Sequence, residues 1–314
     1  MSVHQALGID DVLGFEFVSP PPLDALTAAL EQLLALGALD SHGDLSDTGR
    51  CMSKLPLDPS YSKALLEASH AGCLPAMLSL IAMLSVEGSA FVSPPSQREL
   101  ADEAKRRFSS LQADTITLVN VYAAFGKRKG QAGKQWCEQN FVNRRTLESA
   151  VQVREQLRDT CARLGLLGEG HVEAEALEAT EAARRAQQGL PQVDQDTSRA
   201  LRRCLTAAFF INAAQRQPTG EYLALASRQK VAIHPSSALF SRRVACVLFN
   251  ELLYTTKLYM RDLTQIDAEW LPELAPQSFQ AVEKRANVPG AGGLRHAPDG
   301  PRHQQSDGVT GFGR

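Results

Sequence analysis

The sequence predicts an α+β fold in which a long helical region separates a small helix-and-hairpin unit from a β-barrel. Apolar residues follow a helical period over most of residues 23–167, whereas short alternating or β-branched runs occupy residues 222–263. Residues 168–198 are rich in Glu, Ala and Gln and offer few large apolar anchors, which predicts a mobile acidic linker. At 314 residues the chain has room for two or three such modules.

The first unit is predicted from one helix and one turn. Leucines at helical spacing are followed by Gly37, which is suited to the left-handed position after a helix. The turn-forming residues 41–44 lie between two short apolar runs, which indicates a small hairpin. A helix followed by a hairpin predicts a winged-helix unit over residues 22–57. The leucines expected on the buried helix face are Leu23, Leu26, Leu30, Leu33 and Leu34.

The second module is predicted to be a helical bundle over residues 58–167. Its segments are separated largely by Gly or Pro, and residues 74–84 are apolar on every side, which places that segment at the bundle centre. The expected helices lie near residues 60–70, 75–86, 97–108, 115–126 and 143–164.

The third module is predicted to be a small barrel, an OB-fold, over residues 199–280. A helix near residues 201–214 precedes several short strand-like runs, and short strands in succession are typical of such barrels. The expected strands lie at residues 222–226, 230–234, 244–253 and 257–263. Residues 281–314 lose apolar periodicity and gather Gly, Pro, His and Gln, which predicts a disordered tail.

Charge is segregated along the chain although the net charge is only -2. Residues 1–97 hold three Lys or Arg against eleven Asp or Glu, and residues 168–198 hold two against seven. Residues 98–163 hold thirteen against eight, and residues 199–261 hold ten against two. Clustered positive charge raises the local affinity for phosphate through counterion release. The pattern fits contact with nucleic acid, and equally fits solvated helix faces.

The sequence carries no recognisable site for ATP. Residues 102–105, Asp-Glu-Ala-Lys, resemble the acidic box that holds magnesium in ATPases, but that box must end a buried strand. Residues 96–99 have the pattern of a capping box instead, which predicts that the tetrapeptide lies in an amphipathic helix. Gly126-Lys127 and Gly133-Lys134 are followed by Arg and Gln, so neither completes a phosphate-binding loop. We expect no catalytic residue and no cofactor in this chain.

Metal binding and membrane insertion are also not predicted. The six cysteines include no CxxC pair, which favours reduced thiols in the core over a zinc site or disulfides. The longest strongly apolar stretch, residues 74–86, is too short to span a membrane, and the amino terminus lacks the pattern of a signal peptide. We expect an intracellular protein.

Basic side chains of the bundle are the first candidates for contact with RNA. A glycine-flanked basic loop runs from Gly126 through Lys134 and is followed by Trp136. Two arginine pairs fall near predicted helix ends, where arginine can bridge phosphates bidentately. Solvation of the loop, and salt bridges from the arginines to nearby glutamates, are the structural alternatives. The candidates are Arg106, Arg107, Lys127, Arg128, Lys129, Arg144 and Arg145.

The barrel supplies the remaining candidates. Residues 234–237, His-Pro-Ser-Ser, predict a turn that offers hydroxyl and backbone donors. Alternation along a strand would place Lys257, Tyr259 and Arg261 on one face together. Basic and aromatic side chains on such faces bind single strands in OB-type barrels, although a half-buried strand has the same pattern. The barrel candidates are His234, Lys257, Tyr259 and Arg261.

Several phrases, taken in order over residues 6–280, resemble the carboxy-terminal region shared by DEAH-box and DEAQ-box ATP-dependent RNA helicases. They are residues 7–17, 20–22, 36–40, 52–59, 82–86, 118–122, 135–141, 153–157, 231–237, 254–257 and 266–271, among them Leu-Pro-Leu-Asp-Pro, Gln-Trp-Cys-Glu-Gln-Asn-Phe and Val-Ala-Ile-His-Pro-Ser-Ser. Two positions depart from the family pattern, because Ala113 stands where glycine is expected and Thr115 where histidine is usual.

The resemblance implies a winged helix (22–57), a helical ratchet-like bundle (58–167) and an OB-fold (199–280), with residues 1–21 as an inter-domain segment. It also implies that two RecA-like motor domains, which bind ATP and magnesium in such helicases, are missing from this chain. We therefore expect a fragment, an alternative start or a shortened isoform. By position, Arg144 and Arg145 would lie on a helix turned toward RNA.

We expect a non-catalytic, nuclear RNA-binding and regulatory module of an RNA helicase, which guides single-stranded RNA and couples to the motor domains. The rival hypothesis is a protein-interaction scaffold or competing isoform that binds helicase activators, such as glycine-patch proteins, through the acidic amino-terminal half. A third is an unstable fragment whose docking surface for the motors is exposed.

Overall fold

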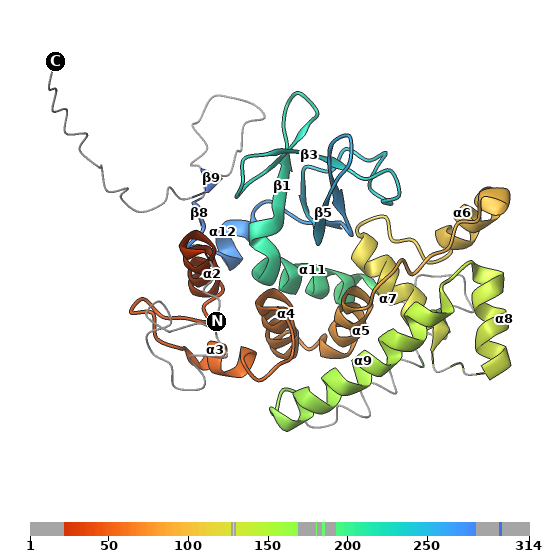
Figure 1. Ribbon diagram of the computed structural model, residues 1–314, viewed down its shortest axis with the longest axis horizontal. Helices are drawn as coiled ribbons and strands as arrows, with labels where there is room; N and C mark the ends of the chain where they lie inside the picture. Colours follow the sequence, from red (N-terminus) through yellow and green to blue (C-terminus); the bar gives the residue numbers. More distant parts are fainter. Residues whose placement is uncertain are drawn as a thin grey trace, which may run out of the picture.

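The computed structural model describes residues 22–126, 128, 130–168, 180, 184–185, 193–280 and 295–296. These residues form helices followed by a β-sheet, as Figure 1 shows, and the predicted α+β class is confirmed. The predicted inter-domain segment 1–21, most of the predicted acidic linker 168–198 and most of the predicted disordered tail 281–314 lie outside the described residues.

The amino-terminal unit consists of a helix, a minimal hairpin and a short second helix. Helix α2 (Leu23–Ala35) is followed by Gly37 with φ +72°, as predicted, and an antiparallel bridge joins Leu39 to Leu45 before α3 (Asp47–Met52). The predicted buried face of α2 is partly wrong. Leu26 and Leu33 are buried, but Leu23 and Leu34 are 67% and 42% exposed because they lie on the outer side of the helix.

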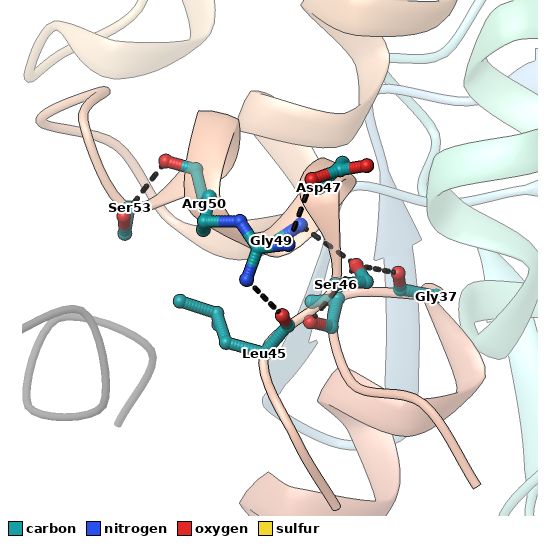
Figure 2. Close-up of polar contacts among 8 residues, drawn as sticks. Gly37, Leu45, Ser46, Asp47, Gly49, Arg50 and Ser53 are labelled. Carbon is teal, nitrogen blue, oxygen red and sulfur yellow. Dashed lines mark hydrogen bonds and ion pairs between the residues drawn. The ribbon is translucent and has the colours of Figure 1, made fainter. Parts of the chain in front are cut away.

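Figure 2 shows how the start of α3 is fixed against the hairpin. The Ser46 hydroxyl donates to the carbonyl of Gly37 at 2.6 Å and accepts from the amide of Gly49 at 3.0 Å. Gly49 is packed so closely that a Cβ there would lie 2.1 Å from the carbonyl oxygen of Ala38. Arg50 donates to the carbonyl of Leu45 at 2.6 Å. The unit is therefore held by contacts between residues close together in sequence.

The bundle is built around α5 (Leu74–Ser85), which contacts α4, α7, α9 and α11 and is buried from Leu74 to Met83 with one exception, Pro75. The prediction of a central apolar helix is thus confirmed. The surrounding helices are α4 (Pro59–His70), α6 (Arg98–Arg106), α7 (Asp114–Phe125), α8 (Gly130–Asn140) and α9 (Arg144–Arg163).

Two local predictions for the bundle are wrong. The basic segment 126–134 is not one loop, because α8 begins at Gly130 and carries Lys134 on a helix. Glycines at 130 and 133 had suggested a loop, but Gly133 packs close to the backbone of Arg128. The capping box at residues 96–99 is also absent, since Pro95 begins the short 3-10 helix η1 (Pro95–Gln97) and Gln97 precedes α6 without a side-chain cap. The amphipathic helix itself is present.

Helix α11 connects the bundle to the barrel and lies between the strands and α4 in Figure 1. It runs from Gln195 to Phe209 and continues into η2 (Phe210–Asn212), so it begins and ends earlier than predicted. The described strands of the sheet are β1 (Ala213–Arg216), β2 (Tyr222–Ala224), β3 (Lys230–Ile233), β4 (Cys246–Leu248), β5 (Glu251–Tyr254), β6 (Leu258–Arg261) and β7 (Thr264–Gln265).

The sheet has the order β5-β6-β3-β2-β1-β4-β7, with β3 and β6 parallel and the other neighbours antiparallel. Strand β1 had been assigned to the end of the preceding helix, because its alanines continue the helical pattern. It pairs with both β2 and β4. After the short helix α12 (Trp270–Leu274), a separate pair joins β8 (Phe279–Gln280) to β9 (Arg295–His296).

One hydrophobic core crosses the module boundaries. It includes Leu33 of α2, Leu65 of α4, Leu80 of α5 and Leu201 of α11, and it continues to Leu248 of β4. A second core fills the barrel, and a third occupies the bundle end around Phe125 and Trp136. Burial of large apolar side chains in a shared core makes rigid placement of the units relative to one another favourable.

Candidate nucleic-acid interface

One carboxylate joins the bundle to the barrel. Asp114, the first residue of α7, accepts hydrogen bonds from the Ser237 hydroxyl at 2.6 Å, the Ala238 amide at 2.8 Å and the Leu263 amide at 3.1 Å. The amide of Asp114 also donates to the carbonyl of Leu263 at 2.7 Å. Hydrogen bonds to an ionised acceptor are the strong ones. Asp114 therefore fixes two barrel segments against the start of a bundle helix.

A second line of contacts continues this junction. The amide of Gln265 donates to the carbonyl of Gln112 at 2.8 Å, and the buried hydroxyls of Thr115 and Thr264 lie 2.7 Å apart. Thr115 is the position where the resemblance had suggested histidine. A small hydroxyl there fits a buried contact between α7 and β7, so this departure from the family pattern lies at the junction itself.

The structure brings two of the barrel candidates together. The rings of His234 and Tyr259 meet edge to face with centroids 5.6 Å apart, and Nδ1 of His234 lies 2.7 Å from the Ser236 hydroxyl. Tyr259 and Arg261 share one side of β6, opposite the buried Met260. Lys257 lies in the β5–β6 turn just before the strand and is exposed.

Lys105 links the bundle to this part of the barrel. Its Nζ donates to the carbonyl of Ser236 at 2.7 Å and lies 5.5 Å from the ring centroid of Phe91. Arg106 and Arg107 follow at the end of α6, are exposed, and make no ion pair with any described residue. Arg106 and Arg107 follow Lys105 at the end of the same helix, so this pair lies near the helix end whose Lys105 contacts the 234–237 turn.

The other bundle candidates have different surroundings. Arg144 pairs with Glu148 at 2.7 Å, whereas Arg145 is exposed and unpaired among the described residues. Arg128 donates to the carbonyl of Phe125 at 2.6 Å and lies over the ring of Trp136, so it holds the end of α7. Lys127 and Lys129 lie outside the described residues.

Comparisons with known proteins match all three modules. Residues 29–57 match the winged-helix part of the helicase-associated domain, residues 58–118 its ratchet-like part, and residues 201–278 the oligonucleotide/oligosaccharide-binding fold. The chain is 41% identical over 292 residues to the Arabidopsis thaliana pre-mRNA-splicing factor ATP-dependent RNA helicase DEAH10. It is 38% identical over 281 residues to human ATP-dependent RNA helicase DHX33, and 36% identical over 278 residues to human probable ATP-dependent RNA helicase DHX35.

This chain has the carboxy-terminal region of a DEAH-box RNA helicase. The alignments cover 89%, 88% and 88% of the chain but only 37%, 36% and 36% of these relatives, so the chain spans about a third of their length. The resemblance that the sequence phrases suggested is confirmed.

In this DEAH-box region the junction also contains Asp262, a carboxyl whose pKa departs from its ordinary value. Burial raises the pKa of its carboxyl to about 6, the nearby Arg261 lowers it, and Asp114, Glu251 and Lys105 make smaller contributions. Asp262 adopts a left-handed backbone conformation with φ +51°. An acidic group with a pKa near neutrality thus lies beside the cations of the junction.

Sequence reasoning missed Lys105 and Asp114. Lys105 was seen only as part of a rejected ATPase box, and an acidic residue at the first position of a helix is ordinarily explained by the helix dipole. Their partners lie 131 and 123 residues away, at Ser236 and Ser237, so no local pattern marks them.

The described residues contain no group of three or more His, Cys, Asp or Glu placed to hold a metal ion. They also contain no helix that is both long enough and apolar enough to cross a membrane.

Proposed function

We propose that this chain is an RNA-binding and coupling module that guides single-stranded RNA for helicase motor domains located outside it. ATP and magnesium would be bound by those motor domains. The observation that carries the proposal is the Asp114 clamp, because it fixes the 234–237 turn beside the basic end of α6. The arginine pair that follows Lys105 and the half-buried ring pair of His234 and Tyr259 would thereby contact one RNA strand from two modules.

Physical chemistry supports an extended single strand as the ligand. Arg106 and Arg107 are exposed and unpaired among the described residues, so their guanidinium groups are available to phosphates. The ring faces of His234 and Tyr259 that do not touch each other are surfaces on which a base can stack, and such stacking contributes about 1–3 kcal/mol per base. Arg145 would add a phosphate contact at the start of α9. The names of the relatives, all RNA helicases, agree with this ligand.

Salt-dependent binding tests the proposal. We expect the purified full chain to bind a fluorescently labelled single-stranded RNA with an affinity that falls steeply as salt rises. Replacing Arg106 and Arg107 with alanine should weaken binding at low salt and reduce the slope of log affinity against log salt by about 1 to 2, one unit per lost phosphate contact. Fluorescence anisotropy at several salt concentrations measures both quantities.

A matched control removes the same charge elsewhere. Lys54 and Arg163 are both exposed and lie away from the barrel turn, in the winged-helix unit and at the end of α9. Their double alanine variant should keep the wild-type slope. Binding that does not respond to salt, or an equal loss in both double variants, would rule the proposal out.

We also propose a nuclear location and a role with RNA-processing machinery. The name of the Arabidopsis relative, a pre-mRNA-splicing factor, supports both. Imaging the full chain fused to a fluorescent protein tests the location, and exclusion from the nucleus would contradict it.

The outer face of α2 favours a second candidate function, docking of an activator such as a glycine-patch protein or of the motor domains. Leu23 is 67% exposed and Leu34 is 42% exposed, and residues 1–97 are strongly acidic. Replacing both leucines with serine should abolish capture of a purified glycine-patch peptide without changing RNA affinity. The Arg106/Arg107 variant should show the reverse, so the two functions are separable.

A further inference from the structure

A cavity of about 920 Å³ lies where the bundle, the start of α11 and the barrel meet. Four parts of the chain line it. They are the segment 109–120 from the bundle, residues between 193 and 198 at the start of α11, the segment 242–245 that leads into β4, and Gln265 of β7. Cavities of several hundred cubic ångström are large enough for a ligand of nucleotide size.

The lining is unusual in its charge and its hydrogen-bonding groups. Arg242 and Arg243 line the cavity, and none of the described residues that line it is Asp or Glu. Amide and hydroxyl side chains supply most of the other polar groups, and Ile116 and Val244 add apolar surface. The amide and hydroxyl groups come from Ser109, Ser110, Gln112, Asn120, Gln195, Ser198 and Gln265.

Several of these groups are already held in place. A guanidinium nitrogen of Arg242 donates to the carbonyl of Leu111, and the Ser198 hydroxyl donates to Oε1 of Gln112 at 3.3 Å. The backbone of Gln112 is fixed by the amide of Gln265. The side-chain NH₂ group of Gln112 therefore keeps a defined direction, and preorganised polar groups lose less entropy when a ligand binds.

We propose that this cavity takes one nucleotide of single-stranded RNA, with its base against the glutamines and its phosphate toward the two arginines. The inference rests on the proposed function. Glutamine and serine side chains hydrogen-bond the edges of unstacked bases, and a guanidinium group binds phosphate or stacks on a base. Among the described residues the lining contains no acidic side chain that would repel the phosphate. RNA bound here is recognised by hydrogen bonds to its base as well as by ionic contacts to its phosphate.

The path to the cavity supports a nucleotide of the same strand. The loop 234–243 begins at His234 beside Tyr259 and ends at Arg243 on the cavity. The Asp114 clamp holds the middle of this loop through Ser237 and Ala238. An RNA strand that follows this loop would pass from the ring pair to the cavity. We therefore expect a base preference at the nucleotide in the cavity and phosphate contacts at the other nucleotides.

Homopolymer binding tests the inference. We expect the wild-type chain to discriminate among oligo(U), oligo(C) and oligo(A) of equal length at one salt concentration, measured by fluorescence anisotropy. Gln112→Ala should weaken binding to the preferred homopolymer about 3- to 10-fold, the effect of one or two lost hydrogen bonds, and should leave the others nearly unchanged. Arg243→Ala should weaken binding to all three.

A second measurement is independent of whether Gln112→Ala folds normally. Arg243 is exposed, so its replacement should not disturb folding, and 4-thiouridine RNA should crosslink to residues 242–245 or 109–112 in the wild type. Equal affinity for all homopolymers, or crosslinks confined to the 234–237 turn, would overturn the cavity assignment while leaving RNA binding intact. Loss of all RNA binding in the wild type would instead overturn the proposed function. Capture of an acidic peptide in preference to RNA would also count against the cavity assignment.

Discussion

The winged-helix unit and the bundle–barrel junction are stabilised by contacts of very different range. In the winged-helix unit the Ser46 hydroxyl bonds the carbonyl of Gly37, nine residues away, and the amide of Gly49, three residues away. At the junction Asp114 bonds Ser237, 123 residues away, and Thr115 meets Thr264, 149 residues away. The first set can form as soon as its own segment folds, whereas the second needs both modules in place.

The difference shows where a change in one residue will have distant effects. Closing a long loop costs conformational entropy before the contact that rewards it can form. The contacts at the junction must therefore offset this entropy cost. Burial of the core shared by Leu80, Leu201 and Leu248 contributes much of the offsetting free energy. Damage to the winged-helix unit should remain local, while damage to the junction should change how the two proposed RNA-binding surfaces lie relative to each other.

The largest effect is expected from Asp114→Ala, which breaks the junction directly. It removes an ionised acceptor and leaves the donors of Ser237, Ala238 and Leu263 without their partner. We expect the free energy of unfolding to fall by about 4 to 5 kcal/mol, because three hydrogen bonds to a charged group are lost and each contributes about 1.5 kcal/mol. Chemical denaturation measures the loss, and hydrogen exchange should rise at residues 237–238 and 263.

The matched control for this change is Asp102→Ala, which removes a carboxylate from the exposed side of α6. It should be nearly neutral. If Asp114→Ala behaves like Asp102→Ala, the clamp does not join the two modules.

A smaller and more local loss is expected from Gly49→Ala in the winged-helix unit. The added Cβ would lie 2.1 Å from the carbonyl oxygen of Ala38 and 2.8 Å from a methyl carbon of Leu45, so the hairpin and α3 must separate. Overpacking of this kind costs about 1–3 kcal/mol. Hydrogen exchange should increase within residues 37–53 and remain unchanged at the junction. Gly168→Ala is the control, because Gly168 has open space around it and no positive φ. A loss of protection that spreads evenly over the chain would contradict a local unit.

The same contrast of range explains what the sequence could predict. Gly37, the apolar helix α5 and the bounds of α4 and α7 to within about one residue follow from local patterns, and the structure confirms them. Strand β1 was assigned to a helix because Ala213 and Ala214 carry no strand signal, and only pairing with β2 and β4 makes the segment a strand. Helix α8 was missed because its glycines indicated a loop, whereas Gly133 packs against the backbone of Arg128.

In the candidate interface, too, the residues marked by local sequence could be predicted, and those with distant partners could not. Exposed arginines such as Arg106 and Arg145 were predicted from composition and helix ends, and they are exposed in the structure. Their role in RNA binding stays a prediction. Lys105 and the Asp114 clamp could not be predicted, because their partners are 131 and 123 residues distant. Family phrases located the modules but not the contacts between them.

A third substitution, at Asp262, should stabilise the junction. The pKa of Asp262 is raised to about 6 from 3.8, so between these values the folded state binds more protons than the unfolded state. The contribution of Asp262 to stability therefore falls as pH rises from about 4 to about 6 and stays low above that range. Asp262→Asn keeps a residue that tolerates a positive φ and removes the buried charge.

We expect Asp262→Asn to be more stable than the wild type at pH 7.5 by about 1 to 2 kcal/mol. This value is smaller than the free energy that corresponds to the whole pKa shift, because the side chain is partly solvated. The difference should shrink toward pH 4, where the folded wild-type carboxyl is protonated. Thermal unfolding of both proteins across this range provides the measurement. A difference that is constant with pH would mean that ionisation of Asp262 is not its cause.

The smallest expected effect on stability comes from Lys105, which lies at the junction but at its solvent edge. Lys105→Ala loses one hydrogen bond to Ser236 and a contact with the ring of Phe91, which together contribute about 0.5–1 kcal/mol. Lys105→Gln can still donate to the Ser236 carbonyl but carries no charge, so it should restore most of the stability. If Lys105 also contacts phosphate, both variants should lower the salt slope of RNA binding by about 1. A slope that recovers with glutamine would mean that Lys105 acts only by positioning the 234–237 turn, and the proposed phosphate contacts would then be limited to the exposed arginines.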